Sequence, residues 1–127
     1  MSFNSEVDAA IKGMERLAEK QVKGSLLGVF SRTISRTPIV SGRLRNNWHT
    51  GIGQVKEGQR KGNRSGVNSL NDAMAVMNKQ FKIGDIVFFS NNLPYARRIE
   101  YGGFSKAPRG MLRISVRELI AIMRKIK

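Results

Sequence analysis

The residues that could perform acid–base or nucleophilic chemistry are few. The chain has no cysteine, which excludes disulfides, thiolate zinc sites and thiol nucleophiles. Its single histidine gives little support to a histidine-based catalytic pair or metal site. Catalysis needs at least two titratable groups held together, yet the largest group of acidic residues falls on one predicted, solvated helix. We therefore predict a protein that is not an enzyme, with no catalytic, metal-binding or cofactor-binding residue.

Basic residues dominate the charged groups, and 23 of them against nine acidic residues give a formal charge of +14. Self-repulsion on this scale favours a polyanionic partner, either nucleic acid or an acidic surface of another protein. A generally basic, soluble surface is the alternative. The candidate contact residues lie in a polar segment and along the C-terminal segment: Lys56, Arg60, Lys61, Arg64, Arg113, Arg117 and Arg124.

The neighbouring side chains of Trp48 and His49 are better explained as packing residues than as binding or catalytic residues. Trp48, the sole tryptophan, is predicted to anchor the core on a strand rather than to stack on a base. His49 beside it is predicted to be a packing or surface residue. Gly58, Gly62 and Gly66 are evenly spaced but lack the strand-to-helix context of a phosphate-binding loop.

The first part of the chain is predicted to form one long helix from about Asn4 to Arg36. Apolar residues recur there every three or four positions and form a single stripe. The sequence Thr37-Pro38 ends the helix, because the residue before a proline avoids helical conformation. Gly24 indicates either a break or a close approach of another backbone. A helix this long in a short chain is expected to contact neighbouring subunits as well.

The rest of the chain is predicted to alternate short strands with helices. Strands are expected at 47–54 and 85–90, and helical segments at 69–80, 95–101 and 111–125. Ser69 is the expected N-cap of its helix, and the second strand is expected to be buried on both faces. Residues 55–68 form a flexible basic loop or arm, most simply an extended hairpin emerging from the sheet. These elements predict a single α+β domain over residues 1–127.

Membrane and export signals are not expected from this sequence. No apolar run approaches the roughly 20 residues that a membrane-spanning helix needs. The N-terminus MSFNSEVDAA also lacks the basic and then apolar pattern of a secretory signal. We therefore expect no membrane partner, and assembly in the cytoplasm.

Three segments carry a resemblance to a known family: TPIVSGRLRNNW from Thr37, NLPYA leading into IEYGG, and KAPRGMLR from Lys106. Together they resemble the neck and tail-completion proteins of tailed phages, the group akin to lambda-like minor tail proteins. The family turn Asp-Thr-Gly is replaced here by Val40-Ser41-Gly42, in which Ser41 can still make the turn hydrogen bond. The matching positions read as structural: Pro38, Gly42, Leu44, Arg45, Trp48, Pro94, Tyr95, Ala96, Glu100, Gly102 and Pro108.

The resemblance implies a structural virion protein of the head–tail neck region. Its subunits would form a hexameric ring around the DNA passage and meet head-closure or connector proteins, and tail-terminator or tail-tube proteins. The basic residues would contact genomic DNA without reading its sequence, or bind acidic neighbours. The alternatives are a small sequence-nonspecific nucleic-acid-binding protein and a tail-terminator subunit that caps the tail tube.

Glu100 is an acidic residue in a strongly basic neighbourhood. We predict that it pairs with Arg43 or Arg45 in a structural salt bridge, with an intersubunit contact as the alternative. Tyr95 and Ala96 are predicted to pack against the long helix.

Overall fold

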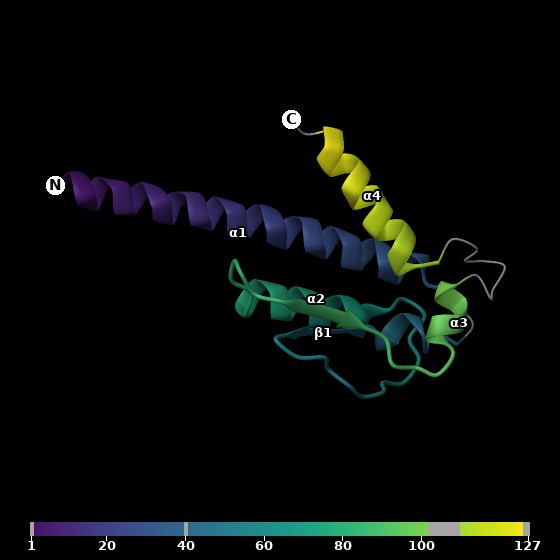
Figure 1. Cartoon of the computed structure of the whole chain (residues 1–127). Coiled ribbons are helices and arrows are strands. Elements are labelled where there is room, and N and C mark those ends of the chain that lie inside the picture. Colours follow the sequence, from purple (N-terminus) through teal and green to yellow (C-terminus); the bar gives the residue numbers. More distant parts are fainter. Residues whose placement is uncertain (1, 40, 102–109, 126–127) are drawn as a thin grey trace.

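The computed structural model describes residues 2–39, 41–101 and 110–125 as four α-helices, a short 3-10 helix and two strands. In chain order the elements are α1 (Phe3–Arg36), η1 (Arg45–Asn47), β1 (His49–Ile52), α2 (Val67–Lys79), β2 (Val87–Ser90), α3 (Ala96–Glu100) and α4 (Leu112–Lys125). The predicted α+β class is therefore confirmed, with its long N-terminal helix, small antiparallel sheet and C-terminal helix (Figure 1).

Helix α1 runs without interruption through 34 residues. It begins where the Ser2 hydroxyl accepts a hydrogen bond from the Ser5 N–H at 3.3 Å, and it ends where Thr37 turns extended before Pro38. The expectation of a break or a close backbone at Gly24 is wrong for the isolated chain. A methyl group placed on Gly24 would meet no atom of the described chain within 4 Å.

The hydrophobic core lies around the C-terminal third of α1 and consists of two adjoining clusters. One cluster contains Ile34, Leu44, Trp48, Leu93, Ala96 and Met111, and the other contains Val29, Phe30, Ala73, Met77 and Phe81. The Phe89 ring joins them, because it stacks on Phe30 at 4.1 Å and on Trp48 at 4.8 Å between ring centroids. Helices α2 and α4 pack against this part of α1 (Figure 1).

The sheet is shorter than predicted. β1 and β2 pair antiparallel from His49 opposite Ser90 to Ile52 opposite Val87. Residues 45–47 form a 3-10 helix rather than part of the strand, because their side chains bind loop backbone. The expected burial of the second strand on both faces is also wrong. All four β2 residues are only half-buried, and Ile86 just before them is 68% exposed.

The connection between the strands does not emerge as an extended hairpin. Residues 53–66 turn back along the domain, and α2 then covers the sheet (Figure 1). Gly66, with φ +68°, is the N-cap of α2, so the predicted helix start at Ser69 is wrong. The buried Ser69 hydroxyl instead accepts a hydrogen bond from Trp48 N–H at 2.9 Å and donates to the Arg45 carbonyl at 2.8 Å.

The N-terminal half of α1 extends away from the rest of the protein (Figure 1). Its apolar residues are exposed, and the exposed fraction reaches 77% at Phe3 and 70% at Met14. Helix α4 starts near the C-terminal end of α1 and diverges from it (Figure 1). None of the helices in the described ranges is long and apolar enough to cross a membrane.

Candidate functional site

The turn of the first resembling segment is held against the basic loop at Gly42. This residue has φ +82°, and a Cβ added there would lie 2.4 Å from backbone atoms of Asn63 and Arg64. The Gly42 carbonyl accepts hydrogen bonds from the N–H groups of Asn46 at 3.0 Å and Asn63 at 3.2 Å. Any L side chain at Gly42 would strain the backbone and displace the loop. Gly42 therefore lets the turn and the loop share one compact structure.

The asparagine pair, Asn46 and Asn47, fastens the basic loop to the domain. Asn46 Nδ2 donates to the Lys61 carbonyl at 2.9 Å, and its Oδ1 accepts from the Asn68 N–H at 3.0 Å. Asn47 Nδ2 donates to the Arg60 carbonyl at 3.0 Å, and its Oδ1 accepts from the Arg60 N–H at 2.6 Å. Both side chains are buried, and they supply hydrogen bonds to the first turn of α2 and to the backbone of residues 60–61, which has no regular secondary structure.

Asp72 neutralises the inner side of the loop. Its Oδ2 accepts a hydrogen bond from the Thr50 N–H at 2.9 Å, and its carboxylate pairs with Lys56 and Arg60 at 3.3 Å each. Arg60 also donates to the Trp48 carbonyl at 2.9 Å. Lys56 and Arg60 were predicted to contact DNA or acidic partners. In the structure both are ion-paired within the chain.

His49 is a buried side chain beside this ion cluster. Its Nε2 lies 3.1 Å from the Gly58 carbonyl, so this nitrogen carries the proton and donates to it. Burial lowers the pKa of His49, and the positive charge of Arg60 lowers it further. The imidazole therefore favours its neutral form, as suits a packing residue.

Arg45 and Trp48 join the motif turn to the end of α1. The Arg45 guanidinium donates to the carbonyls of Ser35 at 2.8 Å and Thr37 at 3.0 Å. Burial lowers the pKa of Arg45 from its usual value. Trp48 is only 4% exposed, and its Nε1 donates to the Thr37 hydroxyl at 2.9 Å. Trp48 is therefore a core residue as predicted, although it stands just before the strand.

Glu100 fixes the start of α4. Its Oε1 accepts hydrogen bonds from the N–H groups of Met111 at 3.1 Å and Leu112 at 2.7 Å, and its Oε2 accepts from Arg113 Nε at 3.0 Å. The predicted pairing of Glu100 with Arg43 or Arg45 is therefore wrong. Arg43 and Arg45 bind Gln59 and backbone carbonyls instead. The partners of Glu100 are 11 to 13 residues away in the sequence.

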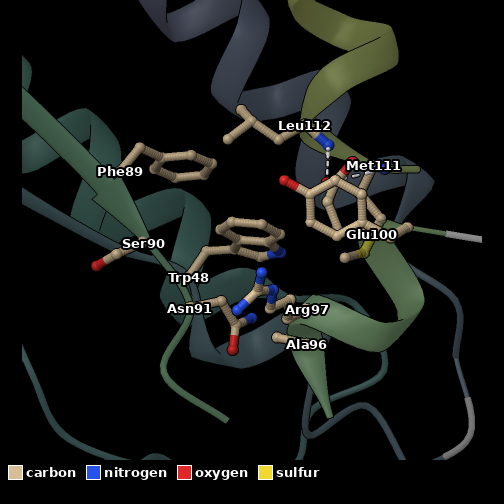
Figure 2. A pocket seen from close by; sticks show the side chains of 10 residues that line it. Trp48, Phe89, Ser90, Asn91, Ala96, Arg97, Glu100, Met111 and Leu112 are labelled. Carbon is tan, nitrogen blue, oxygen red and sulfur yellow. Dashed lines mark hydrogen bonds between the residues drawn. The ribbon is translucent and has the colours of Figure 1, made fainter. Parts of the chain in front are cut away.

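An open hollow of about 310 Å³ lies beside Glu100 (Figure 2). It is lined by Trp48, Phe89, Ser90, Asn91, Ala96, Arg97, Glu100, Tyr101, Met111 and Leu112. Figure 2 shows the Glu100 carboxylate directed at the α4 backbone rather than into this space. Glu100 is the only carboxylate among the lining residues, so the hollow does not bring a paired acid and base together.

The remaining predicted contact residues divide between free surfaces and internal contacts. Lys61 and Arg64 on the loop, and Arg117 and Arg124 on α4, are exposed. Arg113 is occupied within the chain, because it pairs with Glu100 and lies over the Tyr101 ring at 4.5 Å. Three of the seven predicted contact residues, Lys56, Arg60 and Arg113, are therefore ion-paired within the chain.

The other resembling positions surround the same part of the core. Leu44 and Ala96 share a cluster with Ile34 of α1, whereas Tyr95 is partly exposed and lines a small hollow with Pro38. Pro94 is exposed and lies in the turn that leads to α3. Gly102 and Pro108 lie outside the described residues.

Within the described ranges, no three His, Cys, Asp or Glu side chains gather closely enough to hold a metal ion. The two carboxylates at the centre of the domain, Asp72 and Glu100, each bind backbone N–H groups and arginine. These contacts can hold a loop and a helix in place.

Comparison of the chain with protein-family models, with curated proteins and with solved structures finds no match.

The contacts of Asn46, Asn47 and Asp72 were not predicted from the sequence. Asn47 was expected only as the start of the first strand, although two adjacent amides within an apolar pattern are a recognisable signal of buried hydrogen bonding. The partners of Asp72 lie 12 to 22 residues away in the sequence, so no local pattern could identify them.

Proposed function

We propose that the protein is a non-enzymatic structural subunit that assembles with copies of itself into a ring. By the resemblance of its three segments, this ring belongs to the neck or tail-completion region of a tailed-phage virion. The observation that carries the self-assembly is the unpartnered apolar face on the N-terminal half of α1. A soluble monomer rarely leaves so long a row of large apolar side chains in water.

The resembling segments support a scaffold role. Their buried residues pack around one core, and their polar residues fix the loop and α4. In a ring, the exposed Lys61 and Arg64 of each copy would face either the DNA passage or an acidic neighbouring protein. Either contact would be electrostatic and independent of DNA sequence.

Native mass spectrometry and negative-stain electron microscopy of the purified chain test the assembly. We expect closed rings of one copy number in equilibrium with subunits. The virion assignment is tested by detecting the protein in purified particles and by removing its gene, which should leave heads and tails unjoined. A chain that stays monomeric at all concentrations, or particles that mature normally without it, would refute the proposal.

A small nucleic-acid-binding protein is the second candidate, because the charge of +14 favours it. Stacking of bases on Trp48 or Phe89 does not support it, since these rings stack on each other inside the core. Binding of duplex DNA by isolated subunits, at an affinity well above weak nonspecific binding, would favour this candidate over the ring. A tail-terminator role differs from the first proposal only in the rings that the subunit meets.

A further inference from the structure

The N-terminal arm, defined here as residues 3–19 of α1, has one apolar face that nothing in the described chain covers. The face is formed by Phe3, Val7, Ile11 and Met14, which follow one another at intervals of four, four and three residues. This spacing places them on one side of a helix. The arm therefore presents a continuous row of large apolar side chains along its length.

The arm also differs from the rest of the chain in charge. Residues 1–19 contain four acidic and two basic residues, so this segment has a net charge of −2 within a protein of +14. The other residues accordingly carry +16. Helical geometry at about 100° per residue places Asp8, Glu15 and Glu19 along one edge of the apolar face. The basic Lys12 and Arg16 fall on the opposite side of the helix.

Helix α4 has a face with the complementary character. Val116, Ile120 and Met123 are exposed at intervals of four and three residues, and Met123 is 59% exposed. The exposed Arg117 and Arg124 border this row. We call these five residues the outer face of α4.

The outer face of α4 matches part of the arm in length but cannot meet it within one molecule. From Val116 to Arg124 the outer face spans about 12 Å at a rise of about 1.5 Å per residue, and so does the arm from Ile11 to Glu19. Because α1 is one continuous helix, its arm cannot fold back onto the α4 of the same chain (Figure 1).

We propose that the arm of one copy docks on the outer face of α4 of a second copy. Apolar rows cover each other in this contact, and Glu15 and Glu19 face Arg117 and Arg124. The two surfaces differ, so the contact is head-to-tail, and repeated contacts close into a ring when the rotation between copies permits. This inference rests on the proposed self-assembly and names the surfaces that produce it.

Charge exchange tests the contact with the full-length protein. One variant carries Glu15→Arg and Glu19→Arg, a second carries Arg117→Glu and Arg124→Glu, and a third carries all four changes. We expect each of the first two to weaken self-association by about tenfold or more, and the third to recover most of the loss. A matched control, Lys79→Glu with Lys82→Glu, makes the same change in net charge as the second variant, at exposed residues elsewhere, and should leave assembly unchanged.

Dissociation constants come from analytical ultracentrifugation, and circular dichroism checks that each variant is folded. Since the chain has no cysteine, a copy with Met14→Cys can also be mixed with a copy carrying Met123→Cys and treated with a bis-maleimide. The mixture should give a crosslinked heterodimer in higher yield than either copy alone.

The outcomes separate this inference from the proposed function. Rings that persist in all charge variants, or a fourfold variant that stays as weak as its parents, would overturn the arm contact but leave the ring standing. A wild-type chain that is monomeric at all concentrations would overturn both.

Discussion

At the scale of single residues, Glu100 is the side chain whose substitution should lower the stability of the fold most. Its carboxylate accepts hydrogen bonds from three backbone N–H groups and from the Arg113 guanidinium at the positive end of α4. We expect Glu100→Gln to lower the free energy of unfolding by about 2 kcal/mol, because an amide places donors opposite donors. Urea denaturation measures the loss. The control Glu57→Gln, at an exposed carboxylate, should change stability little, and equal losses in the two variants would contradict the assignment.

His49 should make stability depend on pH in the mildly acidic range. Burial, followed by the charge of Arg60, holds the pKa of the folded histidine below the unfolded value of about 6.5. The unfolded chain therefore binds the proton first, so this contribution to stability is complete above about pH 6.5 and is lost as pH falls toward the folded pKa.

The measurement is the change in Tm between about pH 7.5 and about pH 5.5, a range that brackets the unfolded pKa of histidine. We expect a smaller decrease for His49→Gln than for the wild type, because glutamine can still donate to the Gly58 carbonyl but does not titrate. The same decrease in both proteins would show that His49 does not contribute.

Residue roles could be predicted from the sequence where they depend on size and apolarity alone. Trp48 was predicted to lie in the core because a large aromatic side chain in an alternating segment is usually buried, and the structure confirms this. Glu100 was recognised as unusual, but its partners were not, because they lie 11 to 13 residues further along the chain, at the start of another helix. Partner choice is a tertiary property that local spacing does not encode.

At the scale of elements, the uninterrupted course of α1 through Gly24 gives a direct prediction. Gly24 is exposed and a methyl group there would meet no atom within 4 Å in the described chain. Gly24→Ala should therefore raise the free energy of unfolding of the subunit by up to about 1 kcal/mol. Thermal melts of dilute protein measure this effect, and a lower Tm would contradict it. Weaker assembly despite higher stability would place a neighbouring helix at Gly24.

The basic loop should be ordered only while the asparagine pair holds it. Asn47→Ala removes two hydrogen bonds to Arg60 and leaves that backbone without its partner. We expect trypsin to cleave after Arg60 or Lys61 many times faster in this variant than in the wild type. Mass spectrometry of the first fragments identifies the site. Asn92→Ala, at an exposed asparagine, is the control, and equal cleavage rates would show that the pair does not restrain the loop.

Elements with strong periodicity could be predicted well, whereas elements set by side-chain contacts could not. The ends of α1 were predicted to within a residue, because Thr37-Pro38 stops a helix locally. The start of α2 was not, because Gly66 caps it and Ser69 is occupied by Trp48 and Arg45. The loop lacks apolar periodicity and was read as an arm. The loop is held in place by hydrogen bonds from Asn46 and Asn47, and the spacing of apolar residues does not predict such hydrogen bonds.

At the scale of the whole molecule, charge is divided between structural and exposed residues. Lys56, Arg60 and Arg113 form ion pairs within the chain, so they are poor probes of partner binding. Lys61 and Arg64 are exposed on the loop and are the better candidates. The composition predicts a negatively charged partner. The structure was needed to identify which basic residues could contact it, because the sequence does not distinguish an ion-paired cation from an exposed one.

If the proposed assembly binds DNA, this division of charge predicts how its affinity for DNA responds to salt. Each cation that contacts phosphate adds about one unit to the slope of log affinity against log salt concentration, through the release of counterions. Lys61→Gln with Arg64→Gln should therefore weaken binding to short duplex DNA and flatten that slope. Fluorescence anisotropy at several salt concentrations measures both quantities.

Lys12→Gln with Arg16→Gln is a matched control, because it removes the same residue types from the arm and changes net charge equally. If both pairs flatten the slope alike, the attraction comes from total charge. If neither does, the loop cations face protein, and the acidic neighbours of the ring become their expected partners.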